Sequence, residues 1–141
     1  MAAALAAFAA PADGWKHGVY RDGLDGTEWP YAVIHASSGS HEAVLRISKR
    51  SDLAVELLVS NAVCHADPHG GFYCPGRYRF DDGSVEGFSG YAGDNPANGV
   101  MLLGTDEVIR KLRPAKRLRI QLEFVGEAPV TFDFHWDKFP F

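Results

Sequence analysis

Apolar and polar residues alternate through most of the chain after residue 16. The alternation is most regular in residues 117–124 and 130–136, where aliphatic or aromatic side chains occupy every second position and charged or polar side chains lie between them. A period of two is typical of a strand with one buried face. Because a turn at Gly126 separates the two segments, we predict that they pair as an antiparallel hairpin.

Turn residues separate the other alternating segments. Residues 43–50 and 53–60 are joined by a tight connection and predict a second hairpin. Residues 76–80 and 84–91 flank Asp82-Gly83, a dipeptide that favours a two-residue hairpin turn. The remaining predicted strands are residues 16–21, 31–37 and 100–103.

One short helix is predicted among the late strands. Asp106 and Glu107 place acidic side chains in its first turn, basic residues fill its last turn, and Pro114 ends it. Short strands with a single short helix are typical of a mainly β fold. We predict an antiparallel β-sandwich, with a barrel-like closure as the alternative. At 141 residues the chain fits one domain, which we place at residues 13–141.

Residues 1–12 do not continue this pattern. They contain eight alanines and no charged side chain. An apolar run followed by small residues has the form of a secretory signal and its cleavage site, although no basic residue precedes it. We interpret the segment as a signal-peptide remnant or an alanine-rich leader outside the core. The first interpretation places the protein in the periplasm or outside the cell. No stretch is apolar for long enough to predict a transmembrane segment.

Cys64 and Cys74 are the only cysteines. Pro68 and Gly70-Gly71 lie between them and predict a turn that brings the two thiols within bridging range. An even cysteine count in an exported chain favours a disulfide, whereas two free buried thiols remain the alternative in a cytosolic protein. The histidines of this loop do not have the spacing of a zinc site with a second ligand cluster, so we predict no metal.

Charge is distributed unevenly along the chain. Lys and Arg number 14 against 18 Asp and Glu, which gives a net charge of −4 and argues against a nucleic-acid-binding protein. Residues 110–119 nevertheless carry six positive charges and no negative one. Such a strip could bind an anionic partner, although helix-end cations and the outward half of a strand also explain it. The strip consists of Arg110, Lys111, Arg113, Lys116, Arg117 and Arg119.

No catalytic motif stands out. Asp81, Asp82 and Glu86 surround one predicted hairpin, but nothing nearby supplies the apolar pocket that separates the pKa values of an acid and a base. The chain has no Gly-x-Ser-x-Gly elbow and no phosphate-binding or dinucleotide-binding loop. We therefore predict that the protein is not an enzyme and needs no cofactor, and we rank a hydrolytic enzyme third among the functions.

The second half of the chain resembles a known family. Residues 78–83 (YRFDDG), the helix that follows, residues 114–120 (PAKRLRI) and residues 130–134 (VTFDF) occur in the same order as in the exported accessory proteins of bacterial type VI secretion, the VasI type. The similarity is more distant to invasion-associated locus B proteins and covers roughly residues 43–136. It implies a small periplasmic β-sandwich without known catalysis that acts through protein contacts.

These observations predict a non-enzymatic exported accessory module. Its expected partner is another protein or an anionic cell-envelope polymer, bound through the basic strip. The alternative is a β-sandwich that binds a glycan or another small ligand. That ligand would contact the glycine-rich loop of residues 90–99 and exposed aromatic residues such as Phe88 and Tyr91.

Overall fold

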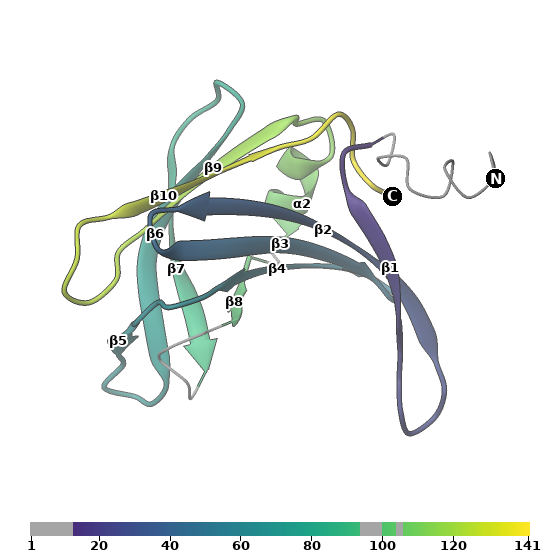
Figure 1. The fold of residues 1–141 in the computed structure, drawn as a ribbon, viewed down its shortest axis with the longest axis horizontal. Helices are drawn as coiled ribbons and strands as arrows, with labels where there is room; N and C mark the ends of the chain where they lie inside the picture. Colours follow the sequence, from purple (N-terminus) through teal and green to yellow (C-terminus); the bar gives the residue numbers. More distant parts are fainter. Residues whose placement is uncertain (1–12, 94–99, 104–105) are drawn as a thin grey trace.

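Two antiparallel sheets and one short helix form the described part of this computed structural model, residues 13–93, 100–103 and 106–141 (Figure 1). Sheet A contains, in spatial order, β1 (Lys16–Arg21), β2 (Glu28–Ser38), β3 (His41–Lys49), β4 (Leu53–Val59) and β8 (Val100–Leu102). Sheet B contains β10 (Val130–His135), β9 (Arg117–Leu122), β6 (Phe72–Phe80) and β7 (Glu86–Gly93), and the short β5 (His65–Ala66) pairs with the start of β6. The helix is α2 (Asp106–Leu112).

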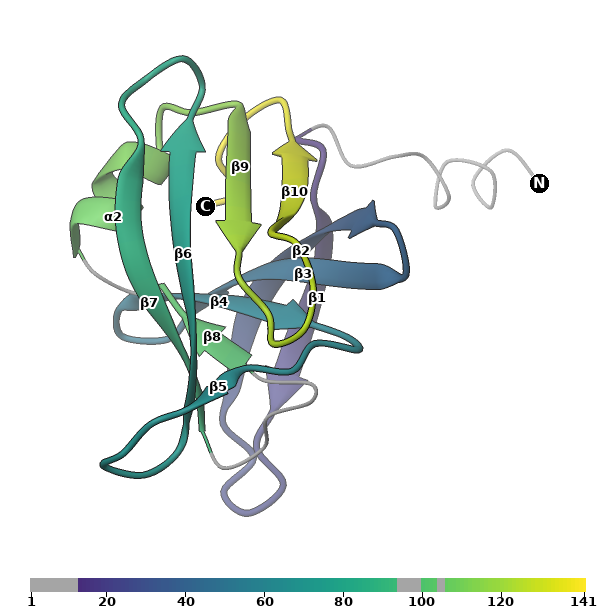
Figure 2. The same cartoon turned by 90° about the vertical axis from the view of Figure 1, so that its left-hand side faces the viewer.

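The two sheets pack face to face with their strands crossing steeply, as Figure 2 shows. Contacts between β10 and β2, and between β7 and β8, join the layers at two places. In the described ranges no hydrogen-bonded ladder connects one sheet with the other, so the architecture is a sandwich and not a closed barrel. The predicted mainly β, antiparallel fold with one short helix between late strands is confirmed.

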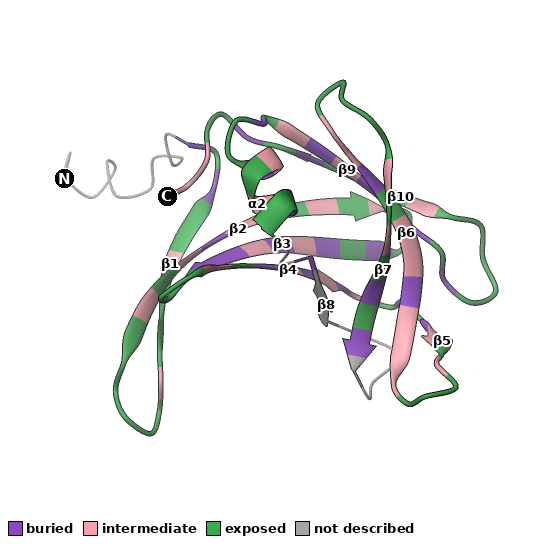
Figure 3. Ribbon diagram, turned by 180° about the vertical axis from the view of Figure 1, so that it is seen from behind, coloured by how far each residue is buried: buried purple, intermediate pink, exposed green. Residues whose placement is uncertain are grey.

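The core lies between the inner faces of the sheets. Strands β9 and β10 supply alternate residues that are almost completely buried, as their sequence pattern predicts, and β3 and β4 supply the opposite wall. The turn end of the β1–β2 hairpin extends beyond sheet B, and β1 is largely exposed (Figure 3). The largest buried side chains of β3, β9 and β10 are Leu45, Ile47, Leu118, Ile120, Leu122, Phe132 and Phe134.

Strand β6 is longer than its sequence pattern predicts. It begins at Phe72 and includes Pro75, whereas the predicted strand began at Gly76. Proline lacks the N–H of a ladder hydrogen bond and is uncommon inside a strand. The N–H and C=O of one strand residue point to the same side. The carbonyl of Pro75 accepts a hydrogen bond from the N–H of Glu123, just beyond the end of β9. The missing N–H would point to the same side, toward Glu123, so only the outermost hydrogen bond between β6 and β9 is absent, and the pairing of Pro75 with Ser89 of β7 does not require this N–H.

The start of the described chain closes one end of the core. Trp15 is completely buried, and its ring centroid lies 5.3 Å from that of Trp136. The carboxylate of Asp13 accepts a hydrogen bond from the N–H of Trp15, and the Asp13 carbonyl accepts one from the N–H of Asp137. Residues 1–12, predicted as a signal remnant or leader, lie outside the described residues.

Candidate functional site

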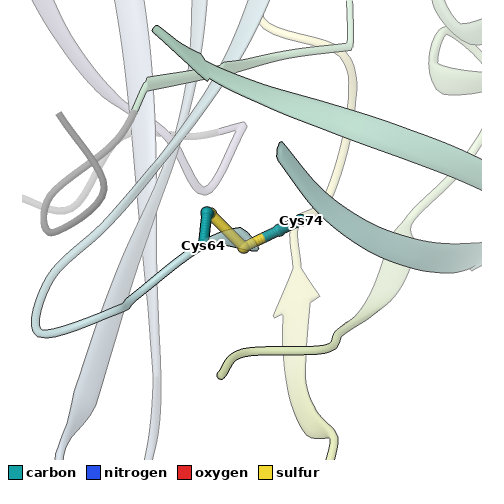
Figure 4. Close-up of a disulfide and its surroundings, with 2 residues drawn as sticks. All are labelled: Cys64 and Cys74. Atoms are coloured by element: carbon teal, nitrogen blue, oxygen red, sulfur yellow. A yellow bond between two sulfur atoms is a disulfide. The ribbon is translucent and has the colours of Figure 1, made fainter. Parts of the chain in front are cut away.

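Cys64 and Cys74 form a disulfide, as predicted (Figure 4). Both residues are buried, and the turn between them contains Gly70 and Gly71, each with a positive φ. The bridge ties the chain after β4 to the centre of sheet B. Since both sulfur atoms are bonded to each other, neither is a thiolate ligand. Among the described residues no three side chains of the metal-ligating types gather in one place.

The basic strip is not the uncompensated positive surface that the sequence suggested. Arg117 donates two hydrogen bonds to Asp133, at 2.9 and 2.7 Å, and these bonds lower the pKa of the Asp133 carboxyl. The Nζ atom of Lys111 lies 3.4 Å from Oε1 of Glu86 and 3.3 Å from Oε1 of Glu107. Strand pairing and helix geometry bring carboxylates beside these two cations that are distant in sequence or one helical turn away. A role of the strip in binding a partner stays a prediction.

The other members of the strip lie in different surroundings. Arg113 stacks over the ring of Phe139 at 4.9 Å. Arg119 donates to the backbone carbonyl of Asp81 at 2.7 Å from the outer face of sheet B. Arg110 and Lys116 are exposed, and their side chains have no carboxylate within ion-pair distance in the described ranges. The members of the strip therefore lie at the end of α2, in the turn that follows and at the start of β9.

The three carboxylates of the β6–β7 hairpin have separate contacts. Asp81 accepts hydrogen bonds from the backbone N–H groups of Lys116 and Arg117, each at 3.1 Å, and so fixes the hairpin turn to the start of β9. The side chain of Asp82 is almost fully exposed, and Glu86 accepts hydrogen bonds from Ser84 and Lys111. These carboxylates do not converge on a common cleft.

The two aromatic residues of the alternative ligand site also lie apart. Phe88 packs against the core, and its ring lies so close to Gly76 that a Cβ on that glycine would approach it to 2.8 Å. Phe88 is half-buried and also lines a cavity of about 280 Å³, so its role as a ligand contact stays a prediction. Tyr91 is 53% exposed on β7, but residues 94–99, which make up much of the predicted loop, lie outside the described residues.

A groove crosses the outer face of sheet A, the face turned away from sheet B. It consists of two adjoining hollows of about 470 and 810 Å³ that share Trp29, Arg50 and Ala54. The smaller hollow lies over the middle of the sheet, and the larger lies between the start of β2 and the turn that joins β3 to β4. We call both hollows together the sheet A groove. The smaller is lined by Tyr20, Trp29, Tyr31, Val33, Val44, Arg46, Ser48, Arg50, Ala54, Glu56 and Leu58.

Aromatic rings form one end of the sheet A groove. Tyr20 lies opposite Trp29 across the β1–β2 ladder, with ring centroids 4.4 Å apart. The guanidinium of Arg50 lies 3.9 Å from the centre of the Trp29 ring, so cation, indole and phenol form a stack. Tyr31 lies across Gly18 of the neighbouring strand, where a Cβ would approach the ring to 2.4 Å. This glycine therefore allows the phenol ring to lie flat on the sheet.

An ion pair lies further along the sheet A groove. Arg46 and Glu56 face each other across the β3–β4 ladder, and Nη2 donates to a carboxylate oxygen at 2.8 Å. Both side chains are partly buried, at 35% and 19% exposure. Val44 and Leu58 form an apolar wall beside the pair. The groove thus combines aromatic faces, an apolar wall and a charged pair that offers both donors and acceptors, a composition typical of ligand sites.

Sequence analysis did not predict the sheet A groove. A signal was present in β2, where Trp29, Tyr31 and Val33 occupy alternate positions and the inward-facing Ala32 and Ile34 follow Tyr31 and Val33. Successive residues of a strand point to opposite faces of the sheet. Apolar residues at both odd and even positions therefore indicate that both faces are covered by other groups or bind a ligand.

His41 is a buried titratable residue outside the groove. Its Nδ1 donates to the carbonyl of Ser60 at 3.1 Å and its Nε2 to the carboxylate of Glu127 at 2.7 Å. Burial opposes the charged form, but these two hydrogen bonds outweigh it and raise the pKa of His41 above its usual value. The pair joins the start of β3 to the turn between β9 and β10 and has a structural role.

Comparisons with family models, with curated proteins and with solved structures found no match to this chain. The resemblance to VasI-type accessory proteins therefore stays a prediction. In the described ranges, no helix combines the length and apolar character that crossing a membrane requires.

Proposed function

We propose that this protein is a non-enzymatic binding module whose sheet A groove binds a glycan. The observation that carries the proposal is the partly exposed set of aromatic rings beside the Arg46–Glu56 pair. A sugar ring presents C–H groups on its faces and hydroxyl groups at its rim. Aromatic rings pack well against the C–H faces. The hydroxyl groups both donate and accept hydrogen bonds, so a guanidinium beside a carboxylate can bind them.

The form of the groove supports this choice over a macromolecular contact through the basic strip. A concave, half-buried surface with several convergent polar groups is the usual form of a small-ligand site. The basic strip, by contrast, has lost part of its available charge to Asp133, Glu86 and Glu107. The proposal therefore keeps the non-enzymatic module that the sequence predicted and moves its contact to sheet A.

The disulfide supports an oxidising compartment as the place of action. Structural disulfides persist in the periplasm and outside cells, and they are rare in the cytosol. The Cys64–Cys74 bridge and the interpretation of residues 1–12 as a signal remnant point the same way. The glycans within reach of such a protein are those of the cell envelope or of the surroundings. A role as a secretion accessory protein stays the expectation of the family resemblance.

Intrinsic fluorescence tests the proposal directly. Trp15 and Trp136 are buried in the core, whereas Trp29 is half-buried in the sheet A groove, so a ligand in the groove changes the emission of Trp29. We expect a saturable change when the protein is titrated with neutral hexose and N-acetylhexosamine oligosaccharides. Removal of one stacking ring by Tyr20→Ala should weaken binding by roughly two- to tenfold, the equivalent of about 0.5–1.5 kcal/mol.

Tyr91→Ala is the matched control. Tyr20 and Tyr91 are 50% and 53% exposed, so the two substitutions remove the same ring from equally exposed positions on different sheets. We expect Tyr91→Ala to leave binding unchanged. Equal weakening by both variants, or the absence of a saturable signal with every oligosaccharide, would contradict a glycan site in the groove.

A further inference from the structure

Three arginines gather on the outer face of sheet B, on the other side of the sandwich from the groove. Arg77 and Arg79 extend from β6, and Arg119 extends from the adjacent β9. They line a cavity of about 200 Å³ together with Val85, Gln121 and Thr131. We call this set the sheet B arginine cluster. Only Arg119 belongs to the basic strip, because Arg77 and Arg79 lie some forty residues earlier in the chain.

Two of these cations oppose each other directly. Arg79 and Arg119 are cross-strand partners in the β6–β9 ladder, a position in which like charges are destabilising. The carboxylate that stands opposite Arg119 on its other side is Asp133. It is already engaged in the two hydrogen bonds from Arg117 and lies 3.0 Å from His135. The nearest carboxylate in register therefore does not neutralise the pair.

The contacts of the cluster within the described ranges are mainly with neutral groups. Arg77 donates from Nε to the side-chain oxygen of Gln121 at 2.9 Å, and Arg119 donates to the backbone carbonyl of Asp81. The one carboxylate within reach belongs to Asp82, which lies 3.9 Å from Arg119 and is almost fully exposed. For the guanidinium of Arg79 the described residues provide neither a hydrogen bond nor an ion pair.

Part of each guanidinium in the opposed pair is also buried without compensation. The Nε–H groups of Arg79 and Arg119 have no acceptor among the described residues. A buried unsatisfied donor and an opposed like charge both reduce the stability of the folded chain. A fold gains nothing by assembling such a cluster for its own stability, whereas an anion in the cavity would relieve the repulsion.

We propose that the sheet B arginine cluster binds a phosphate or sulfate group, held by Arg77, Arg79 and Arg119. Guanidinium groups donate paired N–H groups whose geometry matches oxyanion oxygens. Three convergent guanidiniums fit a group with several oxygens and up to two negative charges better than a singly charged carboxylate. The Thr131 hydroxyl at the wall of the cavity offers one more neutral donor. The sequence predicted an anionic partner at the basic strip, and the proposal places an anion at the sheet B arginine cluster.

NMR titration of the ¹⁵N-labelled full chain tests this site. Buried Nε–H groups exchange slowly with water, so the signals of Arg79 and Arg119 are suitable probes. We expect saturable shifts of both signals on addition of sodium phosphate or sodium sulfate at constant ionic strength, with at least tenfold weaker binding of acetate. The two titrations show whether phosphate or sulfate binds more tightly, and either order of affinity supports the proposal.

Substitutions then connect binding to the cluster. Arg79→Gln should weaken binding at least tenfold, whereas Arg110→Gln, which removes the same charge from an exposed helix position, should change it less than twofold. Arg77 is exposed, and Arg77→Gln provides a second variant should Arg79→Gln not fold. We expect it to weaken binding at least threefold. The anion should also raise the melting temperature of the wild type, and this rise should disappear in the cluster variants.

Three results would overturn the proposal. They are the absence of saturable shifts with both anions, acetate binding as tight as phosphate and sulfate, and equal weakening by Arg110→Gln and the cluster variants. The first would show that the cluster is only a solvated surface. The second would show that it does not distinguish a tetrahedral oxyanion, and the third that only net charge matters. None of these results bears on the sheet A groove, which lies on the other face of the sandwich.

Discussion

Reduction of the Cys64–Cys74 bridge should destabilise the fold by an amount that follows from the size of the loop it closes. The two cysteines are ten positions apart. A cross-link lowers the conformational entropy of the unfolded chain, and the chain-entropy model gives about 2.7 kcal/mol for a loop of this size. For a domain of this length, the loss corresponds to a fall of roughly 8 °C in melting temperature.

Substitution of both cysteines separates this entropic effect from packing. Cys64 and Cys74 are both buried, so the variant Cys64→Ala/Cys74→Ala also loses the contacts of two sulfur atoms. We expect this second effect to add roughly 1–2 kcal/mol. The reduced wild type keeps the sulfur atoms and should therefore lie between the oxidised wild type and the double variant.

Urea unfolding monitored by fluorescence measures all three states. The free energies of unfolding should rank oxidised wild type, reduced wild type and double variant in descending order. A reducing agent should not change the double variant, which serves as the control for effects of the agent itself. Oxidised and reduced wild type that unfold within about 0.5 kcal/mol of each other would refute the loop-entropy reasoning, because no other structural change separates them.

Two further predictions concern the buried histidine and the start of the domain. Because the folded pKa of His41 is raised, its pair with Glu127 should stabilise the fold fully below the unfolded pKa and lose this effect as pH rises through the folded pKa. Urea unfolding should thus show that Glu127→Gln lowers the free energy of unfolding more, relative to wild type, at about pH 5.5 than at about pH 9. An equal decrease at both pH values would contradict this prediction. Removal of residues 1–12 should leave the melting temperature unchanged, whereas removal of residues 1–15 should cost roughly 3–5 kcal/mol because the buried ring of Trp15 is lost. Thermal unfolding of the two shortened chains checks this, and a similar loss in both would show that the first segment contributes to the core.

The strands that were predicted well are those whose stabilising contacts are reflected in local pattern. Residues 117–124 and 130–136 alternate without interruption, and the structure pairs them in register with their apolar side chains in the core. The start of β6 was missed because Pro75 is a strand breaker in most contexts. It is tolerated where β9 has already ended, and the sequence of β6 alone does not contain that information.

The candidate sites were predicted poorly for a related reason. A run of six cations is visible in sequence, but the carboxylates that neutralise Lys111 and Arg117 come partly from other strands. Conversely, Arg79 does not belong to a run of cations in the sequence. It becomes significant only because it lies opposite Arg119 across a ladder. Proximity in sequence overestimated the available positive charge of the basic strip and did not reveal the sheet B arginine cluster.

The sequence by itself determined the local features of this protein: where strands alternate, where turns fall, where the short helix begins and ends, and that Cys64 and Cys74 can meet. These depend on side-chain period and turn chemistry within a few residues. The tertiary structure alone decided which outward-facing residues become neighbours, namely the sheet A groove on one face and the sheet B arginine cluster on the other. The period of two assigns a side chain to a face, but strand order and register between distant segments decide what lies beside it.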